Sequence, residues 1–106
     1  MAIITHKRGD TFELTLTLEN QGNAVDITLF TIACQVRDQE DALIQALTVT
    51  KTDPTNGVFT LTAADTETDD WPLSKLDTDV EFIEPDATVS SSETFNIQVI
   101  KDITRV

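Results

Sequence analysis

The chain has 106 residues, of which 19 are acidic and 7 are basic, and its formal net charge is −12. This length suits one domain, residues 1–106, that folds without disulfides or metal, and the single cysteine excludes a disulfide framework or a cysteine-rich zinc site. The acidic excess excludes the basic patch that nucleic acids and anionic membranes require, and no apolar run is long enough to cross a membrane.

Threonine is the second compositional signal, with 18 residues against only 3 glycines. Threonine is β-branched and favours strands, and on the solvent side of a strand it stays polar. The composition therefore predicts an all-β domain in which each sheet has one face in water.

Alternation of apolar and polar residues locates the first strands. We expect one strand at 2–7 and another at 11–19, where every second residue is apolar and helical spacing does not fit. Residues 20–23, Asn-Gln-Gly-Asn, favour a turn that ends the second strand. The inward side chains of the second strand are expected to be Phe12, Leu14, Leu16 and Leu18.

Three strands are expected in the middle of the chain, at 31–37, 42–51 and 58–63. The strand at 42–51 needs a bulge near Ile44, because Leu43 and Ile44 compete for the same face. Residues 53–57 contain Asn-Gly, a strong hairpin signal, just before the third of these strands. The inward residues are expected to be Ile32, Cys34, Val36, Leu47, Val49, Phe59, Leu61 and Ala63.

The C-terminal third begins with one helical turn at 65–71, capped by Asp65 or Thr66 and prevented from extending by Pro72. A strand follows at 77–83, then a turn at 84–87, a loop at the three serines 90–92, and a last strand at 93–103. The inward residues of these two strands are expected to be Val80, Phe82, Phe95, Ile97, Val99 and Ile103. About seven strands with regular turns are typical of an antiparallel β-sandwich or barrel.

Arg8-Gly9-Asp10 is the tripeptide that integrins recognise on some extracellular proteins. Three residues carry little specificity, and we expect no signal peptide at the N-terminus, because its charges follow the short apolar run. We interpret the tripeptide as a turn between the first two strands, with Asp10 hydrogen-bonded to the backbone.

Acidic residues are concentrated between 65 and 86, where Lys75 is the only base. Two interpretations stay open for this stretch, a charged surface that maintains solubility and a docking face for a basic protein surface. Both are favoured over a mimic of nucleic-acid phosphates, which would need the acids along one ridge. The acids are Asp65, Glu67, Asp69, Asp70, Asp77, Asp79, Glu81, Glu84 and Asp86. A calcium loop starting at Asp65 would need Gly and Glu where Asp70 and Leu76 stand, so no metal site is expected.

Catalysis finds no support in the sequence. His6 is the only histidine, Cys34 is the only cysteine and lies on an inward face, and neither a nucleophile elbow nor a Gly-rich phosphate loop is present. We therefore expect no enzyme, no catalytic residues and no cofactor. Trp71 is interpreted as a plug at one end of the core, the alternative being an exposed sugar-stacking residue of a carbohydrate-binding module.

The ordered set of short motifs resembles a family of small phage and prophage proteins that share the immunoglobulin-like domain at the N-terminus of phage baseplate upper proteins. The matching segments cover nearly the whole chain and are Arg8–Phe12, Gly22, Val25–Thr28, Val36–Arg37, Gly57–Leu61, Thr66–Pro72, Asp79–Phe82, Glu93–Phe95 and Lys101–Arg105. The chain departs from the pattern at 71–74, where relatives often have a Gly-Tyr or similar aromatic hairpin.

The resemblance implies an immunoglobulin-like β-sandwich that acts as a non-enzymatic structural module of a phage tail or baseplate. It would be made in the cytoplasm of the host bacterium and reside in the virion, with other virion proteins, or further copies of itself, as partners. Strands 2–7 and 93–103 are the expected sheet edges for such contacts. Two alternatives stay open, a head–tail joining or completion protein and an acidic inhibitor that mimics nucleic acid.

Overall fold

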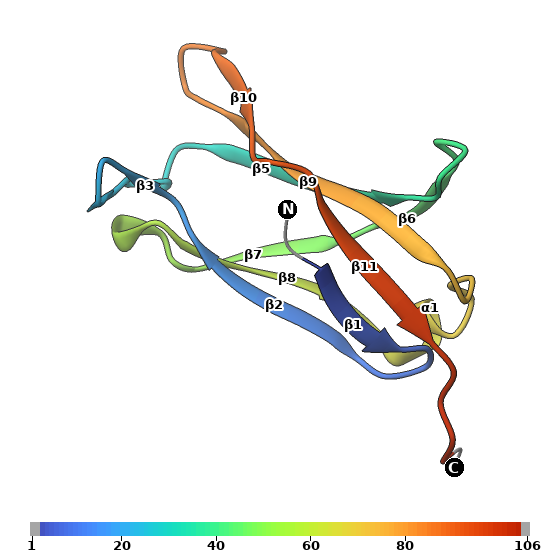
Figure 1. Cartoon of the computed structure of the whole chain (residues 1–106). Coiled ribbons are helices and arrows are strands. Elements are labelled where there is room, and N and C mark those ends of the chain that lie inside the picture. Colours follow the sequence, from blue (N-terminus) through green and yellow to red (C-terminus); the bar gives the residue numbers. More distant parts are fainter. Residues whose placement is uncertain (1–2, 105–106) are drawn as a thin grey trace.

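Eleven strands and two short helical turns form the part of the chain that the computed structural model describes, residues 3–104 (Figure 1). The strands are β1 (Ile3–Lys7), β2 (Phe12–Thr17), β3 (Glu19–Asn20), β4 (Asn23–Ala24), β5 (Thr31–Arg37), β6 (Leu43–Ala46), β7 (Thr48–Asp53), β8 (Val58–Ala63), β9 (Lys75–Ile83), β10 (Val89–Ser91) and β11 (Phe95–Ile100). The turns are η1 (Pro54–Asn56) and α1 (Asp65–Thr68). Two residues of the sequence analysis, Ala2 and Arg105, lie outside the described residues.

The strands form two layers, as the alternation predicted. The larger sheet has the order β1-β11-β9-β5-β6, with β10 also paired to β9, and the smaller sheet has the order β2-β8-β7. A small hairpin of β3 and β4 extends beyond them. The β-sandwich is thus confirmed, with one departure from the antiparallel expectation, since β1 runs parallel to β11. No helix within residues 3–104 is long and apolar enough to span a membrane.

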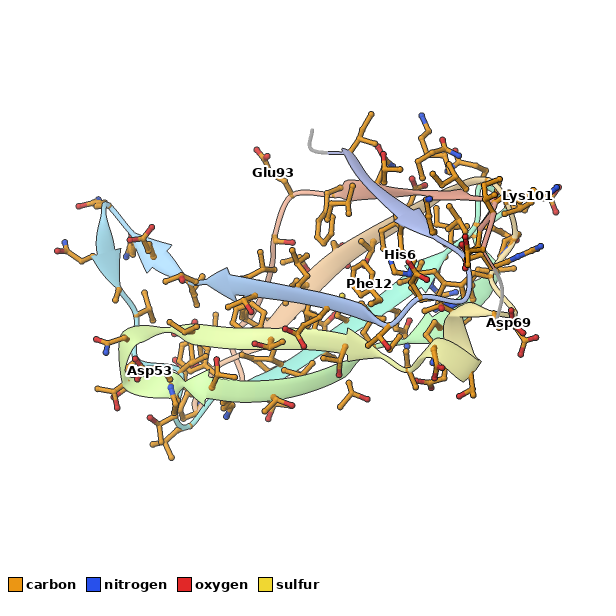
Figure 2. All side chains as sticks on the ribbon, turned by 90° about the horizontal axis from the view of Figure 1, so that it is seen from below. His6, Phe12, Asp53, Asp69, Glu93 and Lys101 are labelled. Carbon is orange, nitrogen blue, oxygen red and sulfur yellow. The ribbon has the colours of Figure 1, made fainter. Side chains whose placement is uncertain are left out.

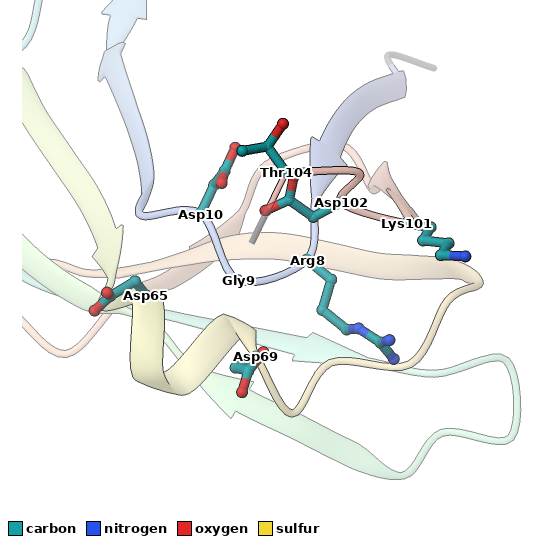
Figure 3. Close-up of a pocket in the computed structure, with 8 residues that line it drawn as sticks. All are labelled: Arg8, Gly9, Asp10, Asp65, Asp69, Lys101, Asp102 and Thr104. Carbon is teal, nitrogen blue, oxygen red and sulfur yellow. The ribbon is translucent and has the colours of Figure 1, made fainter. Parts of the chain in front are cut away.

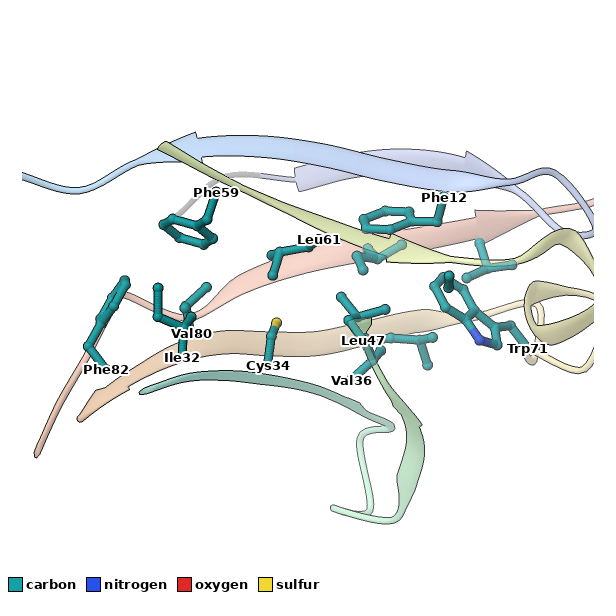
Figure 4. Close-up of a cluster of buried hydrophobic side chains, with 14 of the residues drawn as sticks. Phe12, Ile32, Cys34, Val36, Leu47, Phe59, Leu61, Trp71, Val80 and Phe82 are labelled. Atoms are coloured by element: carbon teal, nitrogen blue, oxygen red, sulfur yellow. The ribbon is translucent and has the colours of Figure 1, made fainter. Parts of the chain in front are cut away.

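The core lies between the sheets, where the inward side chains of both layers meet (Figure 4). Strand β5 shows the pattern clearly, because Ile32, Cys34 and Val36 are buried while the residues between them are exposed. The other residues expected to point inward are buried or half-buried against the core, except Ile103, which is 73% exposed because β11 ends at Ile100. The buried apolar residues are Phe12, Ile27, Ile32, Cys34, Val36, Leu47, Phe59, Leu61, Ala63, Trp71, Leu76, Val80, Phe82, Ile97 and Val99.

The stretch predicted as one strand at 42–51 is two strands in different sheets. The chain crosses from β6 to β7 at Leu47, which is buried and donates its N–H to the carbonyl oxygen of Cys34 at 2.9 Å. The bulge expected near Ile44 is confirmed, because Val36 faces Gln45 while Arg37 faces Leu43, which leaves Ile44 as the extra residue.

The hairpin predicted at 53–57 is confirmed, and it depends on Gly57. This glycine has φ of 76°, and a Cβ atom there would lie 2.6 Å from the carbonyl oxygen of Leu18 and 2.7 Å from that of Val25. The carbonyl of Gly57 accepts the N–H of Leu18 at 2.9 Å, so the hairpin tip is bonded to the segment that leaves β2.

The loop predicted at the serines 90–92 is wrong. Val89–Ser91 is strand β10, and Ser92 still pairs with β9, since its N–H donates to the carbonyl of Val80 at 2.8 Å. The register shifts by one residue between Ser91, which faces Glu81, and Phe95, which faces Thr78. Residues 92–94 therefore form a bulge in one long strand that runs from β10 into β11.

Two further expectations need correction. Strand β11 lies between β1 and β9, so of the two predicted edges only β1 is a sheet edge. The cap of α1 is Ala64, not Asp65 or Thr66: its own N–H donates to the Glu67 carboxylate at 2.8 Å, which closes the first turn without a capping side chain.

The buried leucines should carry much of the stability. We expect Leu76→Ala to lower the free energy of unfolding by ~2–5 kcal/mol, because Leu76 is fully buried and its truncation leaves a cavity. Chemical denaturation measures this loss. The matched control is Leu29→Ala, at a leucine that is 76% exposed, where a change within about 0.5 kcal/mol is expected. Equal losses for the two variants would contradict the core described above.

Candidate docking surfaces

The acids between 65 and 86 occupy three separate places along strand β9 and its two ends. Four lie on or directly after α1, three point outward from β9, and two lie on the β9–β10 turn. Figure 1 shows α1 and this turn at opposite ends of β9. The structure therefore brings together subsets of the nine predicted residues but does not gather them on one surface. Whether any subset binds a partner stays a prediction.

The end of the sandwich beneath α1 is closed by aromatic rings. The Trp71 ring lies 5.7 Å from the rings of both Phe12 and His6, and His6 meets Phe12 edge-on at 5.2 Å. Trp71 is only 1% exposed, and its indole N–H donates to Gln45 at 3.4 Å. The core plug is confirmed, and the sugar-stacking alternative is wrong, because the face of a buried ring cannot meet a sugar.

Thr68 joins α1 to the turn that contains Arg8-Gly9-Asp10. Its buried hydroxyl accepts the N–H of Gly9 at 3.1 Å and donates to the carbonyl of Asp10 at 2.7 Å. The same carbonyl lies 3.0 Å from Nε2 of His6, and Gly9 has φ of 90°, which favours glycine. The tripeptide is thus the turn between β1 and β2 that the sequence predicted. Contacts with Thr68 and His6 hold it in place.

A hollow of about 410 Å³ lies between this turn, α1 and the segment after β11 (Figure 3). Its lining contains charges of both signs, with Arg8 and Lys101 on one side and Asp10 and Asp65 on the other. Asp69 also lines it, whereas Glu67 does not, because its carboxylate is bonded to Ala64 and to Gln45. Asp65 and Asp69 therefore share a mixed-charge surface with Arg8 and Lys101.

The outward row on β9 is Asp77, Asp79 and Glu81, which face Arg37, Gln35 and Ala33 of β5 in register. Asp77 is bonded within the chain, because its carboxylate accepts hydrogen bonds from the Asn96 amide at 2.6 Å and the Gln39 amide at 3.1 Å. Asp79 and Glu81 are exposed. A nucleic-acid mimic would need a longer ridge of exposed acids than these residues provide.

One of the two acids of the β9–β10 turn, Asp86, stabilises that turn through its side chain. Asp86 accepts the N–H of Thr88 at 3.0 Å, and this bond, followed by that to the Thr88 hydroxyl, lowers the pKa of the Asp86 carboxyl. Asp26 forms the same kind of turn with Thr28, whose hydroxyl and then N–H lower the pKa of Asp26. Asp86 thus stabilises the turn as a carboxylate, and Glu84 is its half-buried neighbour.

Cys34 is buried as predicted. Burial raises the pKa of its thiol, although the nearby Thr78 hydroxyl, at 3.2 Å from the sulfur, opposes this rise. A thiol of this kind is a small apolar group and not a nucleophile at neutral pH. Within residues 3–104, no group of three or more His, Cys, Asp or Glu side chains is placed to hold a metal.

One apolar surface was missed by the sequence analysis. Residues Ile4, Leu14, Leu16 and Phe95, together with 92–94, line a hollow of about 450 Å³ between the edge strands β1 and β2, which we call the open groove. These four apolar side chains are only half-buried. Alternation identified Leu14, Leu16 and Phe95 as inward, but it contains no signal that the two sheets part at this place.

No protein-family model and no curated protein sequence matches the chain. Among solved structures, the N-terminal domain of phage TP901-1 ORF48 is similar, with a TM-score of 0.66 and 16% identity over 94% of this chain and 86% of that one. CopC from Methylosinus trichosporium OB3b is also similar, with a TM-score of 0.58 and 10% identity over 98% of this chain and 91% of that one. These likenesses show a shared fold.

The Thr68 hydroxyl should stabilise the end of the sandwich. We expect Thr68→Val to lower the free energy of unfolding by ~1–3 kcal/mol, because the N–H of Gly9 and the carbonyl of Asp10 each lose a partner while the side-chain shape is kept. Faster amide hydrogen exchange at Gly9 should accompany the loss. Thr66→Val, on the exposed side of α1, is the matched control. The bonding role fails if both variants lose the same stability.

Fluorescence reports directly on the plug, because Trp71 is the only tryptophan. We expect a blue-shifted emission and weak quenching by acrylamide in the native protein, since the indole is excluded from water. Denaturant should shift the emission to longer wavelength and restore quenching. Strong quenching in the native protein would mean that the ring is exposed.

Proposed function

We propose that the protein is a non-enzymatic structural module of a phage or prophage virion, in the region of the tail or baseplate, and that it acts through contacts with other virion proteins. The observation that carries this proposal is the fold likeness to the N-terminal domain of phage TP901-1 ORF48 over 94% of the chain. The family resemblance of the sequence motifs supports the same setting, including the immunoglobulin-like character of the sandwich.

The side chains support contact in preference to chemistry. Cys34 is buried beside Thr78, and His6 is packed against Phe12 and Trp71. Neither lines the hollows at the α1 end or in the open groove. The surface instead contains charged groups with local partners and free sheet edges, which are features that position one protein against another.

The fold alone does not decide the role, since CopC has a similar fold. The proposal therefore rests on the phage likeness together with the motifs. Other virion proteins are the proposed partners, and self-association into a homo-oligomer is part of the proposal because virion parts assemble with symmetry.

Purified particles test the proposal. Quantitative mass spectrometry of gradient-purified virions should find this protein in a fixed ratio to the major tail protein, and antibody labelling in the electron microscope should mark the tail end that meets the host. A capsid protein is the positive control, and a phage replication enzyme is the negative one. Absence from the particles would refute the proposal.

Two other results would replace it. Labelling at the junction of head and tail would favour a joining or completion protein. Salt-sensitive capture of a DNA-binding host enzyme, together with absence from particles, would favour an acidic inhibitor.

A further inference from the structure

The open groove lies at the edge of the larger sheet, where the edge strand β1 covers only half of the neighbouring strand. Strand β1 lies beside only the second half of the long bulged strand, with Ile3 facing Asn96 and Lys7 facing Ile100. The first half of that strand, from Val89 to Phe95, is bonded to β9 on its inner side. On its outer side the described residues place no further strand.

The main chain of β10 is oriented to bond a strand in this position. Ser92 donates its N–H to Val80, and the carbonyl of Thr88 accepts the N–H of Glu84, so the even-numbered residues bond to β9. Because an antiparallel ladder alternates, Val89 and Ser91 direct their N–H and carbonyl groups away from β9. An edge of this kind pairs with an extended segment of another chain.

The side chains beneath the same position are apolar. Leu14 and Leu16 of β2 and Phe95 of β11 are only half-buried, and β2 is itself an edge strand. An added strand would point every second side chain toward these residues, because the side-chain period of a strand is two.

The charge of the groove decides what kind of strand fits. Glu93 lines it in the bulge at 92–94, and Figure 2 shows this side chain projecting outward from the start of β11. A second copy of the chain has the same Glu93 and the same net charge of −12, so self-pairing here is opposed by repulsion. A segment with a basic residue opposite Glu93 would be attracted.

We propose that the open groove binds an extended segment of another protein, with aliphatic side chains at alternate positions and Lys or Arg near Glu93. The segment adds to the larger sheet as a strand beside β10, in line with β1 at the same edge of the sheet. This proposal names the kind of partner and rests on the proposed function only for the source of that partner, another virion protein.

A synthetic peptide tests the proposal with the full chain. The probe is a nine-residue peptide that alternates valine and threonine and has a lysine at each end. Nuclear magnetic resonance titration should shift the methyl signals of Ile4, Leu14 and Leu16 and slow the amide exchange of Val89 and Ser91. A control peptide of the same composition, with its valines in one block, should bind at least about tenfold more weakly, because it cannot match the alternation.

Charge reversal separates the groove from the rest of the acidic surface. We expect Glu93→Lys to weaken peptide binding by about fivefold or more, and added salt to reduce the difference between the variant and the native chain. The matched control is Glu84→Lys, on the β9–β10 turn and outside the groove lining, which should bind as the native chain does. Both variants change an acid near the surface, and their unfolding midpoints verify that they fold.

Three results would overturn the proposal. They are no binding at millimolar peptide, binding that shifts residues away from both the open groove and β10, and equal affinities for the native chain and Glu93→Lys. Self-association that protects Val89 and Ser91 in concentrated protein would identify a second copy as the occupant and overturn it as well. None of these results bears on whether the protein is found in virions, so failure here is distinct from failure of the proposed function.

Discussion

Strand β9 is the element on which the rest of the molecule depends, because both of its sides are bonded along its length. It spans nine residues, and β5 covers one side from Asp77 to Ile83. The other side is covered by β10 and β11, which requires a bulge at 92–94 to keep both in register. This central arrangement buries Leu76, Val80 and Phe82 against the smaller sheet. It also fixes where β1, the next strand outward, begins to pair.

The short length of β1, the edge strand, explains the open groove. Within the described residues, β1 has five residues and pairs only with residues 96–100, so the outer side of residues 89–95 is not covered by a described strand. The smaller sheet does not compensate, because β2 ends the layer on the same side. A mismatch in strand length thus leaves apolar side chains and main-chain groups exposed at one place. The groove is therefore a consequence of the topology and not of a special sequence motif.

The charge of the protein is distributed according to the same architecture. Acids project from α1, from the outer face of β9 and from the β9–β10 turn, and several of them are bonded within the chain. Glu67 closes the first turn of α1, Asp77 binds two amides, and Asp86 stabilises a turn. Much of the negative charge therefore stabilises the fold, independently of any role in recognition. The open groove, with one acid at its edge, is the surface where apolar contact and charge combine.

The sequence by itself determined the layers of this protein, since burial of every second residue is visible in local alternation. The inward faces of β2, β5 and β8, the bulge at Ile44, the hairpin at Gly57 and the plug at Trp71 all follow from neighbours along the chain. Only the tertiary structure decided which strands pair, because hydrogen bonds between strands join residues distant in sequence. The parallel pairing of β1, the interior place of β11 and the strand at 89–91 depend on such bonds, and so does the groove that they leave open.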